Sequence, residues 1–179
     1  DEFHERSLNA DLGLALCLEV RAALREDLIL LPMSATLEAA PVADLMGGAP
    51  VIRAEGRAHP VDIRWRERPL PRGARLPDAV AEAVRAALEA TGGDVLAFLP
   101  GEGEIRRTLA ALEGTVPADV ALRPLYGALP FAAQRAAIAP ATAGRKVVLA
   151  TAIAETSLTI EGITAVVDAG LARRARFDP

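Results

Sequence analysis

The sequence is poor in cysteine, with a single one, Cys17, among its 179 residues. One cysteine excludes an internal disulfide and a zinc cluster built on several cysteines, and this usage is typical of a reducing cytoplasm. The chain also lacks a secretory signal pattern and any apolar run long enough to span a bilayer. Because Cys17 lies within an apolar helical pattern, we expect it to be a small buried hydrophobic residue. The predicted protein is cytoplasmic and makes no membrane contact.

An excess of positive charge is also missing. The chain has 20 Lys and Arg residues against 24 Asp and Glu residues, which gives a net charge of −4. This balance excludes a general electrostatic attraction to nucleic acid, so any such contact must come from a local patch. Lys146 is the only lysine, an imbalance that we attribute to a GC-rich genome. The arginine-rich and proline-rich segment 64–77 is interpreted as a solvated linker.

Apolar residues are plentiful, at 51% of the chain, and charged residues make up only 25%. Such a chain can form a packed core and is not disordered. Its length suits one large domain or two small or incomplete ones. The first residue is Asp and lies within a motif described below, so we expect a piece of a longer polypeptide whose other parts are its partners.

Hydrophobic periodicity predicts helices that alternate with short strands along most of the chain. The predicted helices are 8–25, 37–46, 77–90, 102–112 and 130–138. The predicted strands are 28–33, 95–99, 120–125, 147–150 and 163–167. The apolar stripe of the first helix is broad, so we expect that helix to be covered on more than one side. The alternation predicts an α/β fold built from parallel βαβ units.

A polar loop, 151–162, separates the last two predicted strands and begins at the carboxyl end of a buried strand. Ligands of open α/β sheets bind at such ends. The loop carries hydroxyl and carboxylate side chains from Thr151, Glu155, Thr156, Ser157, Thr159 and Glu161. These groups can contact phosphate oxygens, ribose hydroxyls or a metal-bound water. On composition alone, an ordinary crossover loop is the more common explanation.

The chain opens with two adjacent carboxylates followed by an imidazole, Asp1-Glu2-Phe3-His4. In nucleotide hydrolysis a first carboxylate can hold Mg²⁺, and the next can orient or deprotonate the attacking water. Surface Asp-Glu pairs are common, so this motif is weak evidence by itself. The segment Ser34-Ala35-Thr36 follows a predicted strand and is equally weak by itself, because its hydroxyls can simply begin the next helix.

Five motifs in one order carry more information than any of them separately. They are Asp-Glu-Phe-His (1–4), Ser-Ala-Thr (34–36), Phe-Leu-Pro-Gly-x-x-Glu-Ile (98–105), Leu-Tyr-Gly-x-Leu-Pro (125–130) and Thr-x-Ile-Ala-Glu-Thr-Ser-Leu-Thr-Ile (151–160). In this order the chain resembles the DEAH-box helicases of superfamily 2 essentially from end to end, as a fragment that runs from motif II to motif V. Segments 1–7 and 173–179 add a likeness to bacterial members of that family.

The resemblance implies two RecA-like (P-loop NTPase) domains, with ATP and Mg²⁺ between them and RNA across their top. Residues 1–50 would be the C-terminal part of the first domain, 51–76 an interdomain segment, and 77–179 a nearly complete second domain. The family couples ATP hydrolysis to unwinding of RNA or movement along it. Its RNA contacts are to the backbone and carry little sequence preference.

Roles in hydrolysis follow from the same resemblance. Asp1 would hold Mg²⁺ through water, and Glu2 would be the general base. His4 would complete the catalytic set and link the nucleotide site to Ser34 and Thr36, the residues that couple hydrolysis to strand separation.

Roles in ligand binding follow in the same way for the second domain. Thr159, Glu161 and Ser157 would contact the nucleotide. Thr151 and the backbone around Gly101 would contact the RNA sugar-phosphate chain.

The sequence departs from the family pattern in several places. The phosphate-binding Gly-x-Gly-Lys-Thr/Ser loop that precedes the first motif is absent, and the arginine-finger motif would lie beyond Pro179. Ala152 stands where the family commonly has Asn, and Ile138 falls about where eukaryotic relatives place an adenine-stacking Phe. We therefore expect the fragment itself to be inactive.

Two alternatives stay open at this point. The chain could be a non-catalytic RecA-like module that binds RNA or a protein, or part of a DNA-directed helicase of the same superfamily. The intact first motif and the full polar loop favour the RNA helicase, since a degenerate module need not keep them.

Overall fold

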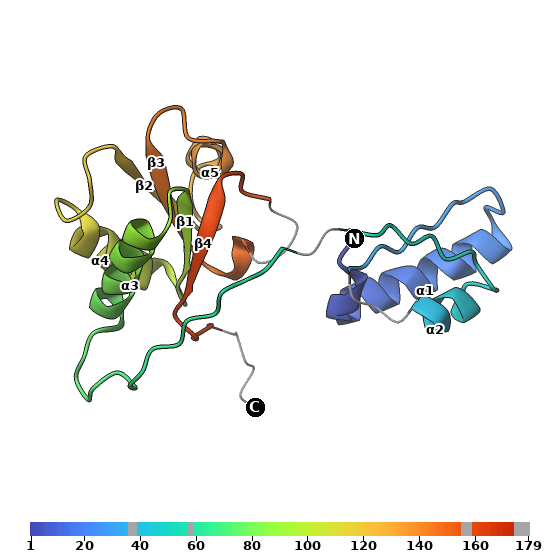
Figure 1. Ribbon diagram of the computed structural model, residues 1–179. Helices are drawn as coiled ribbons and strands as arrows, with labels where there is room; N and C mark the ends of the chain where they lie inside the picture. Colours follow the sequence, from blue (N-terminus) through green and yellow to red (C-terminus); the bar gives the residue numbers. More distant parts are fainter. Residues whose placement is uncertain (36–38, 57–58, 155–158, 174–179) are drawn as a thin grey trace. The chain divides into compact units, whose positions relative to one another are not determined.

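The computed structural model describes residues 1–35, 39–56, 59–154 and 159–173. The chain divides into two compact units, Asp1–Trp65 and Arg66–Pro179 (Figure 1). Each unit is described by itself below.

The first unit is built from a short 3-10 helix, η1 (Phe3–Glu5), and two α-helices, α1 (Leu8–Ala23) and α2 (Ala39–Leu45). The predictions of the two α-helices are confirmed. The prediction of a strand at 28–33 is wrong, because these residues form no ladder. A strand needs a neighbour for its backbone N–H and C=O groups, and the described part of this unit contains no other strand.

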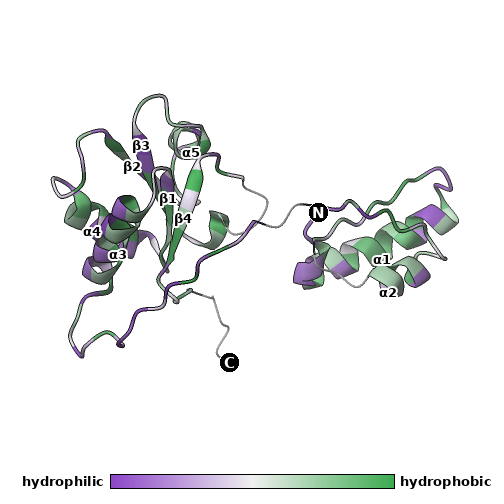
Figure 2. Cartoon of the chain, viewed as in Figure 1, coloured by the Kyte–Doolittle hydropathy of each residue, from purple (hydrophilic) through white to green (hydrophobic). Residues whose placement is uncertain are grey.

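The apolar stripe of α1 is exposed, contrary to the expectation that this helix is covered on more than one side. Figure 2 shows how strongly hydrophobic the helix is. Leu12 and Leu16 are each 53% exposed, and the ends of the stripe at Leu8 and Leu24 are 80% and 79% exposed. Cys17 is also exposed, so its predicted burial is wrong as well. The described elements of the first unit are too few to cover this helix.

The second unit alternates strands with helices, as predicted. Its strands are β1 (Asp94–Phe98), β2 (Val120–Leu125), β3 (Arg145–Ala150) and β4 (Ile163–Asp168). Its helices are α3 (Leu76–Ala90), α4 (Glu102–Leu112), α5 (Phe131–Ile138) and the short 3-10 helix η2 (Ala152–Ala154).

The four strands form one sheet in the order β2-β3-β1-β4, and every neighbouring pair is parallel. Val95 of β1 pairs with Val147 of β3 on one side and with Ala165 of β4 on the other. The predicted α/β class is confirmed. Because the strands are parallel, all their carboxyl ends lie at one edge of the sheet, called here the carboxyl edge, and all their starts lie at the opposite, amino edge.

The sheet is covered on both faces, with α3 and α4 on one face and α5 on the other (Figure 1). Alternate residues of β1 enter different cores, because successive side chains of a strand point to opposite faces. Val95 packs with Val84 and Ile105 in the first core, whereas Leu96 packs with Leu125 in the second. This two-sided burial explains why the central strands are continuous apolar runs.

Close packing at the start of β1 requires a glycine. A Cβ added to Gly93 would meet the side chain of Thr164 in β4, whose Cβ would lie only 2.9 Å away. Gly92, its neighbour, has open space around the same position.

We predict that Gly93→Ala lowers the free energy of unfolding of the second unit by about 1–3 kcal/mol, because the strands must separate to admit the methyl group. Gly92→Ala is the matched control and should change it by less than about 0.5 kcal/mol. Denaturant titration of both variants checks this, and equal stabilities would contradict the packing argument.

Candidate functional site

The opening motif lies beside the segment that begins the predicted coupling motif. The backbone N–H of Phe3 donates to the carbonyl of Met33 at 2.9 Å, and the Phe3 ring is buried. This hydrogen bond holds Asp1–His4 next to the segment that contains Ser34. Thr36, the other predicted coupling residue, lies outside the described residues.

The predicted general base has an unusual backbone conformation. Glu2 has φ 53° and ψ 34°, in the left-handed region, and so does Arg6 after η1 with φ 48°. Non-glycine residues adopt this region at a cost of about 1–3 kcal/mol, and such residues cluster at functional sites. The left-handed turn at Glu2 directs the chain into η1.

His4 lies against the carboxylate of Glu2. Its Nδ1 is 3.4 Å from Glu2 Oε2, which is within ion-pair range for a protonated imidazole but too long for a strong hydrogen bond. The same Nδ1 is enclosed and has no hydrogen-bond partner in the described part of the chain. A buried polar atom without a partner requires an explanation, and a functional role is a common one. The structure therefore brings two of the three predicted catalytic side chains together.

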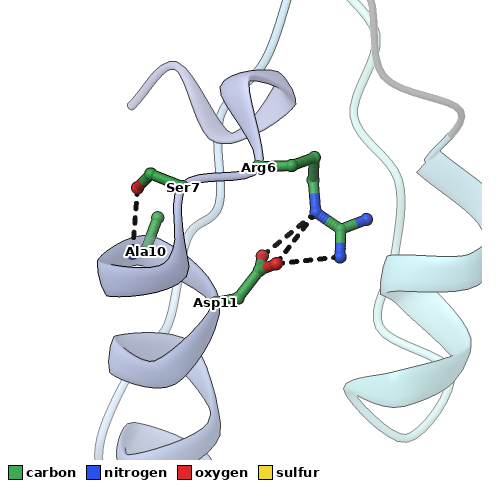
Figure 3. Close-up of polar contacts among 4 residues, drawn as sticks. All are labelled: Arg6, Ser7, Ala10 and Asp11. Atoms are coloured by element: carbon green, nitrogen blue, oxygen red, sulfur yellow. Dashed lines mark hydrogen bonds and ion pairs between the residues drawn. The ribbon is translucent and has the colours of Figure 1, made fainter. Parts of the chain in front are cut away.

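A polar turn connects the motif to α1 (Figure 3). Ser7 is the N-cap of α1, and its Oγ accepts a hydrogen bond from the Ala10 N–H at 3.1 Å. Arg6 makes a two-pronged contact with Asp11, with Nε to Oδ1 at 3.0 Å and Nη2 to Oδ2 at 3.0 Å. Asp11 also lies in the first turn of α1, where a negative charge is favourable to the helix dipole. These contacts fix the direction in which the motif leaves the helix.

Two predicted RNA-binding positions in the second unit lie at the carboxyl edge, on neighbouring strands. Gly101 follows β1 and Thr151 follows β3. The Leu99 N–H donates to the Ala150 carbonyl at 2.8 Å, and the Thr151 N–H donates to the Leu125 carbonyl at 3.2 Å. The residues that follow β1 and β3 are thus hydrogen-bonded to the last residues of β3 and β2 at this edge.

The backbone at Gly101 begins α4 and is flanked by charged groups. A Cβ at this position would lie 3.2 Å from Glu104 Oε2 and 3.4 Å from the Arg173 side chain. Glu104 Oε1 accepts hydrogen bonds from Arg107 at 2.7 Å and from Arg173 at 3.2 Å. Glycine therefore leaves the backbone open, and two arginines offset the carboxylate beside it.

The polar segment between β3 and β4 crosses the sheet from one edge to the other. It begins at Thr151 on the carboxyl edge, and it ends at Gly162, whose carbonyl accepts a hydrogen bond from the Asp94 N–H at the start of β1. Ile160 is 8% exposed and packs in the second core, while Thr159 and Glu161 on either side of it are exposed. The predicted nucleotide-binding residues are thus separated from the predicted RNA-binding residues. Ser157 lies outside the described residues.

Two buried charged residues at the amino edge, Lys146 and Asp94, had no predicted role. Lys146 is 2% exposed and Asp94 is 6% exposed. Burial lowers the pKa of the Lys146 ammonium, while the carboxylates of Asp94 and Glu161 oppose that shift. The sequence signal that points to Lys146 is its rarity, because it is the only lysine of the chain.

Neither a membrane span nor a preformed metal cluster is found in the described ranges. Their helices are all too short or too polar to cross a bilayer. The same residues contain no group of three or more His, Cys, Asp or Glu side chains placed to hold a metal.

Comparison with known proteins shows what the chain is similar to. No family model matches it. It is 56% identical over 180 residues to the ATP-dependent RNA helicase HrpB of Escherichia coli strain K12, a match that covers 100% of the chain and 22% of HrpB. The similarity to this helicase therefore runs along the whole chain.

A second relative and two crystal structures agree with this result. The ATP-dependent RNA helicase HrpA of the same organism is 37% identical, over 99% of the chain and 14% of HrpA. A crystal structure of the E. coli DEAH/RHA helicase HrpB matches with a TM-score of 0.86 at 55% identity, over 99% of the chain and 23% of that structure. A crystal structure of the E. coli DExH-box NTPase HrpB matches with a TM-score of 0.80 at 55% identity, over 99% and 22%.

The predicted resemblance to the DEAH-box helicases is therefore confirmed, and so is the RecA-like fold. The two curated relatives are enzymes, and both are named ATP-dependent RNA helicases. The chain spans about a fifth of HrpB and a smaller share of HrpA.

We predict that Ser7→Ala weakens the first turn of α1 by about 1 kcal/mol, because the Ala10 N–H loses its acceptor. Amide hydrogen exchange at Ala10 should accelerate accordingly. Ser7→Asp is the matched control, since aspartate supplies an acceptor and a favourable charge, and its exchange should match the unsubstituted chain. Equal exchange in all three proteins would contradict the capping role.

Proposed function

We propose that the chain is part of an ATP-dependent RNA helicase that couples Mg-ATP hydrolysis to unwinding of RNA or movement along it. The observation that carries the proposal is the match to HrpB over the whole chain, with the predicted motifs in place. Residues 1–50 are assigned to the first RecA-like domain, 51–76 to the interdomain segment and 77–179 to the second domain. The division of the chain after Trp65 falls within the proposed interdomain segment, which supports this assignment. The single cysteine suits a cytoplasmic location.

Hydrolysis is assigned to the opening motif. Glu2 is the general base that orients and deprotonates the attacking water, and Asp1 holds Mg²⁺ through water. The donor set fits this ion, because Mg²⁺ prefers carboxylate oxygens and retains several waters. Asp1 is exposed, and its Oδ1 accepts the Glu2 N–H at 2.9 Å, which orients the carboxylate. When bound, the ion would neutralise charge on the β- and γ-phosphates.

Coupling is assigned to His4, together with Ser34 and Thr36. His4 contacts Glu2, and the Phe3 hydrogen bond to Met33 keeps the motif beside the Ser34 segment. A change in the position of Glu2 on hydrolysis would therefore reach the coupling segment through direct contacts. Such small shifts produce larger rearrangements in domains that open and close on a ligand.

RNA binding is assigned to the carboxyl edge of the second unit, with Thr151 and the Gly101 backbone contacting sugar and phosphate. Backbone N–H groups at a helix start favour anions, and Gly101 precedes α4 with the positively charged side chain of Arg173 beside it. Thr159, Glu161 and Ser157 are assigned to the nucleotide. The RNA contacts are to sugar and phosphate and do not read base edges, so little sequence preference is expected.

We predict that Glu2→Gln in the full-length protein lowers RNA-stimulated ATP turnover by about 10²–10⁴-fold, because an amide cannot accept the proton of the attacking water. ATP binding should persist. Glu5→Gln removes a nearby exposed carboxylate without an assigned role and should leave turnover unchanged. Intact turnover in Glu2→Gln would refute the general-base assignment.

Assays of the unsubstituted full-length protein separate the proposed function from its alternatives. Unwinding of RNA duplexes in preference to DNA duplexes supports the proposal, and the reverse preference indicates a DNA helicase. RNA binding without ATP hydrolysis indicates a non-catalytic module.

The isolated chain should not hydrolyse ATP, because its one lysine is a buried strand residue and not part of a phosphate-binding loop.

A further inference from the structure

The buried ammonium of Lys146 is bonded to the last turn of α5. Its Nζ donates to the carbonyls of Ala137 at 3.2 Å, Ile138 at 3.3 Å and Ala139 at 2.5 Å. The final carbonyls of a helix have no partner within the helix, and a positive charge beside them is favourable. Lys146 therefore satisfies the end of α5 and ties it to the start of β3.

The residue type is informative at this position. An ammonium presents three donors around one atom, whereas a guanidinium presents a planar and wider fork. Three converging carbonyls in a space that is almost closed to solvent suit the compact ammonium. Lys146 is the only lysine among the 20 Lys and Arg residues of the chain.

A second set of contacts connects Lys146 to the segment before β4. The backbone N–H of Lys146 donates to Asp94 Oδ1 at 2.8 Å, and the N–H of Asp94 donates to the Gly162 carbonyl at 2.9 Å. Gly162 has φ +88°, and a Cβ there would lie 2.8 Å from Asp94 Oδ2. Asp94 thus fixes the position of Gly162 relative to Lys146.

Apolar residues from the end of α5 and from the segment 159–162 also share one core cluster. Ile138, at the end of α5, packs against the core cluster that contains the buried Ile160. Thr159 and Glu161, which flank Ile160, remain exposed. The end of α5 and the segment 159–162 are therefore held together by one polar and one apolar set of contacts.

We propose that Lys146 and Asp94 are positioning residues for nucleotide binding. They fix the segment 159–162 relative to the end of α5, so that the side chains of Thr159 and Glu161 point toward the nucleotide. The inference rests on the function proposed above. Neither buried residue needs to touch the nucleotide itself.

The test is Lys146→Met in the full-length protein, with steady-state ATPase kinetics in ATP and in RNA. Methionine is an unbranched apolar side chain one atom shorter than lysine, and it leaves the three carbonyls without a donor. We expect the KM for ATP to rise about tenfold, because Thr159 and Glu161 lose their fixed position, and misplaced binding groups can cost up to about 100-fold. The KM for RNA should stay within about twofold, because the RNA positions lie at the opposite edge of the sheet.

Two variants accompany this measurement. Lys146→Arg keeps the charge but not the shape, and it should give a smaller rise in the KM for ATP. Arg135→Met removes a positive charge from the exposed side of α5, where Arg135 lies over the Phe131 ring, and should leave the KM for ATP unchanged.

A second approach leaves Lys146 in place, in case its replacement prevents folding. Gly162→Ala places a methyl group against Asp94 and should raise the KM for ATP in the same direction. Gly114→Ala is its matched control, because Gly114 also has a positive φ, +69°, but has open space around it. Backbone strain alone would affect both variants equally.

The outcomes separate this inference from the proposed function. A raised KM for ATP with an unchanged KM for RNA supports positioning. A lower kcat with both KM values unchanged means that less protein is folded, and it contradicts positioning, as does an equal rise in both KM values. Absence of ATPase activity in the unsubstituted full-length protein would contradict the proposed function and this inference together.

Discussion

Parallel pairing of β1 with β3 and β4 determines where each polar loop of the second unit can lie. In a parallel sheet each connection must return from the carboxyl edge to the amino edge. The segment after β3 therefore starts at the carboxyl edge, where Leu99 bonds to Ala150, and ends beside Asp94 at the amino edge. One stretch of polar residues is divided in this way between two edges of the sheet. The two groups of predicted binding residues are separated because of the topology, not because of any local preference of the loop.

Burial of charge at the amino edge shows how this sheet tolerates polar groups in its interior. Transfer of an isolated ammonium from water costs far more than one hydrogen bond returns. Lys146 offsets part of that cost because three helix carbonyls accept its hydrogen bonds and the charges of Asp94 and Glu161 favour the ammonium form. Arg145, the preceding residue, does the same for α3 by donating to the carbonyls of Leu88 and Gly93. Two adjacent basic residues thus satisfy helix ends on opposite faces of the sheet.

The second unit could be predicted from the sequence in nearly all its elements, because each carries a periodic apolar pattern and clear boundaries. The prediction of a strand at 28–33 failed, because an apolar run forms a strand only where a neighbouring strand can pair with it. The places of Thr151 and Gly101 followed from the ends of predicted strands. The role of Lys146 was missed, because the sequence shows its rarity but not the three carbonyls that make its shape necessary. Contacts between α5 and β3 arise only from packing.

The segment between β3 and β4 also gives the second unit a direct covalent connection between the two edges. Its start is held by the Thr151 hydrogen bond to Leu125, and its end is held by the buried Ile160 and by Asp94. If RNA lies at one edge and the nucleotide at the other, each ligand bears on one end of this segment. Packed interiors resist local compression, so the sheet holds the two ends of this segment at a fixed separation.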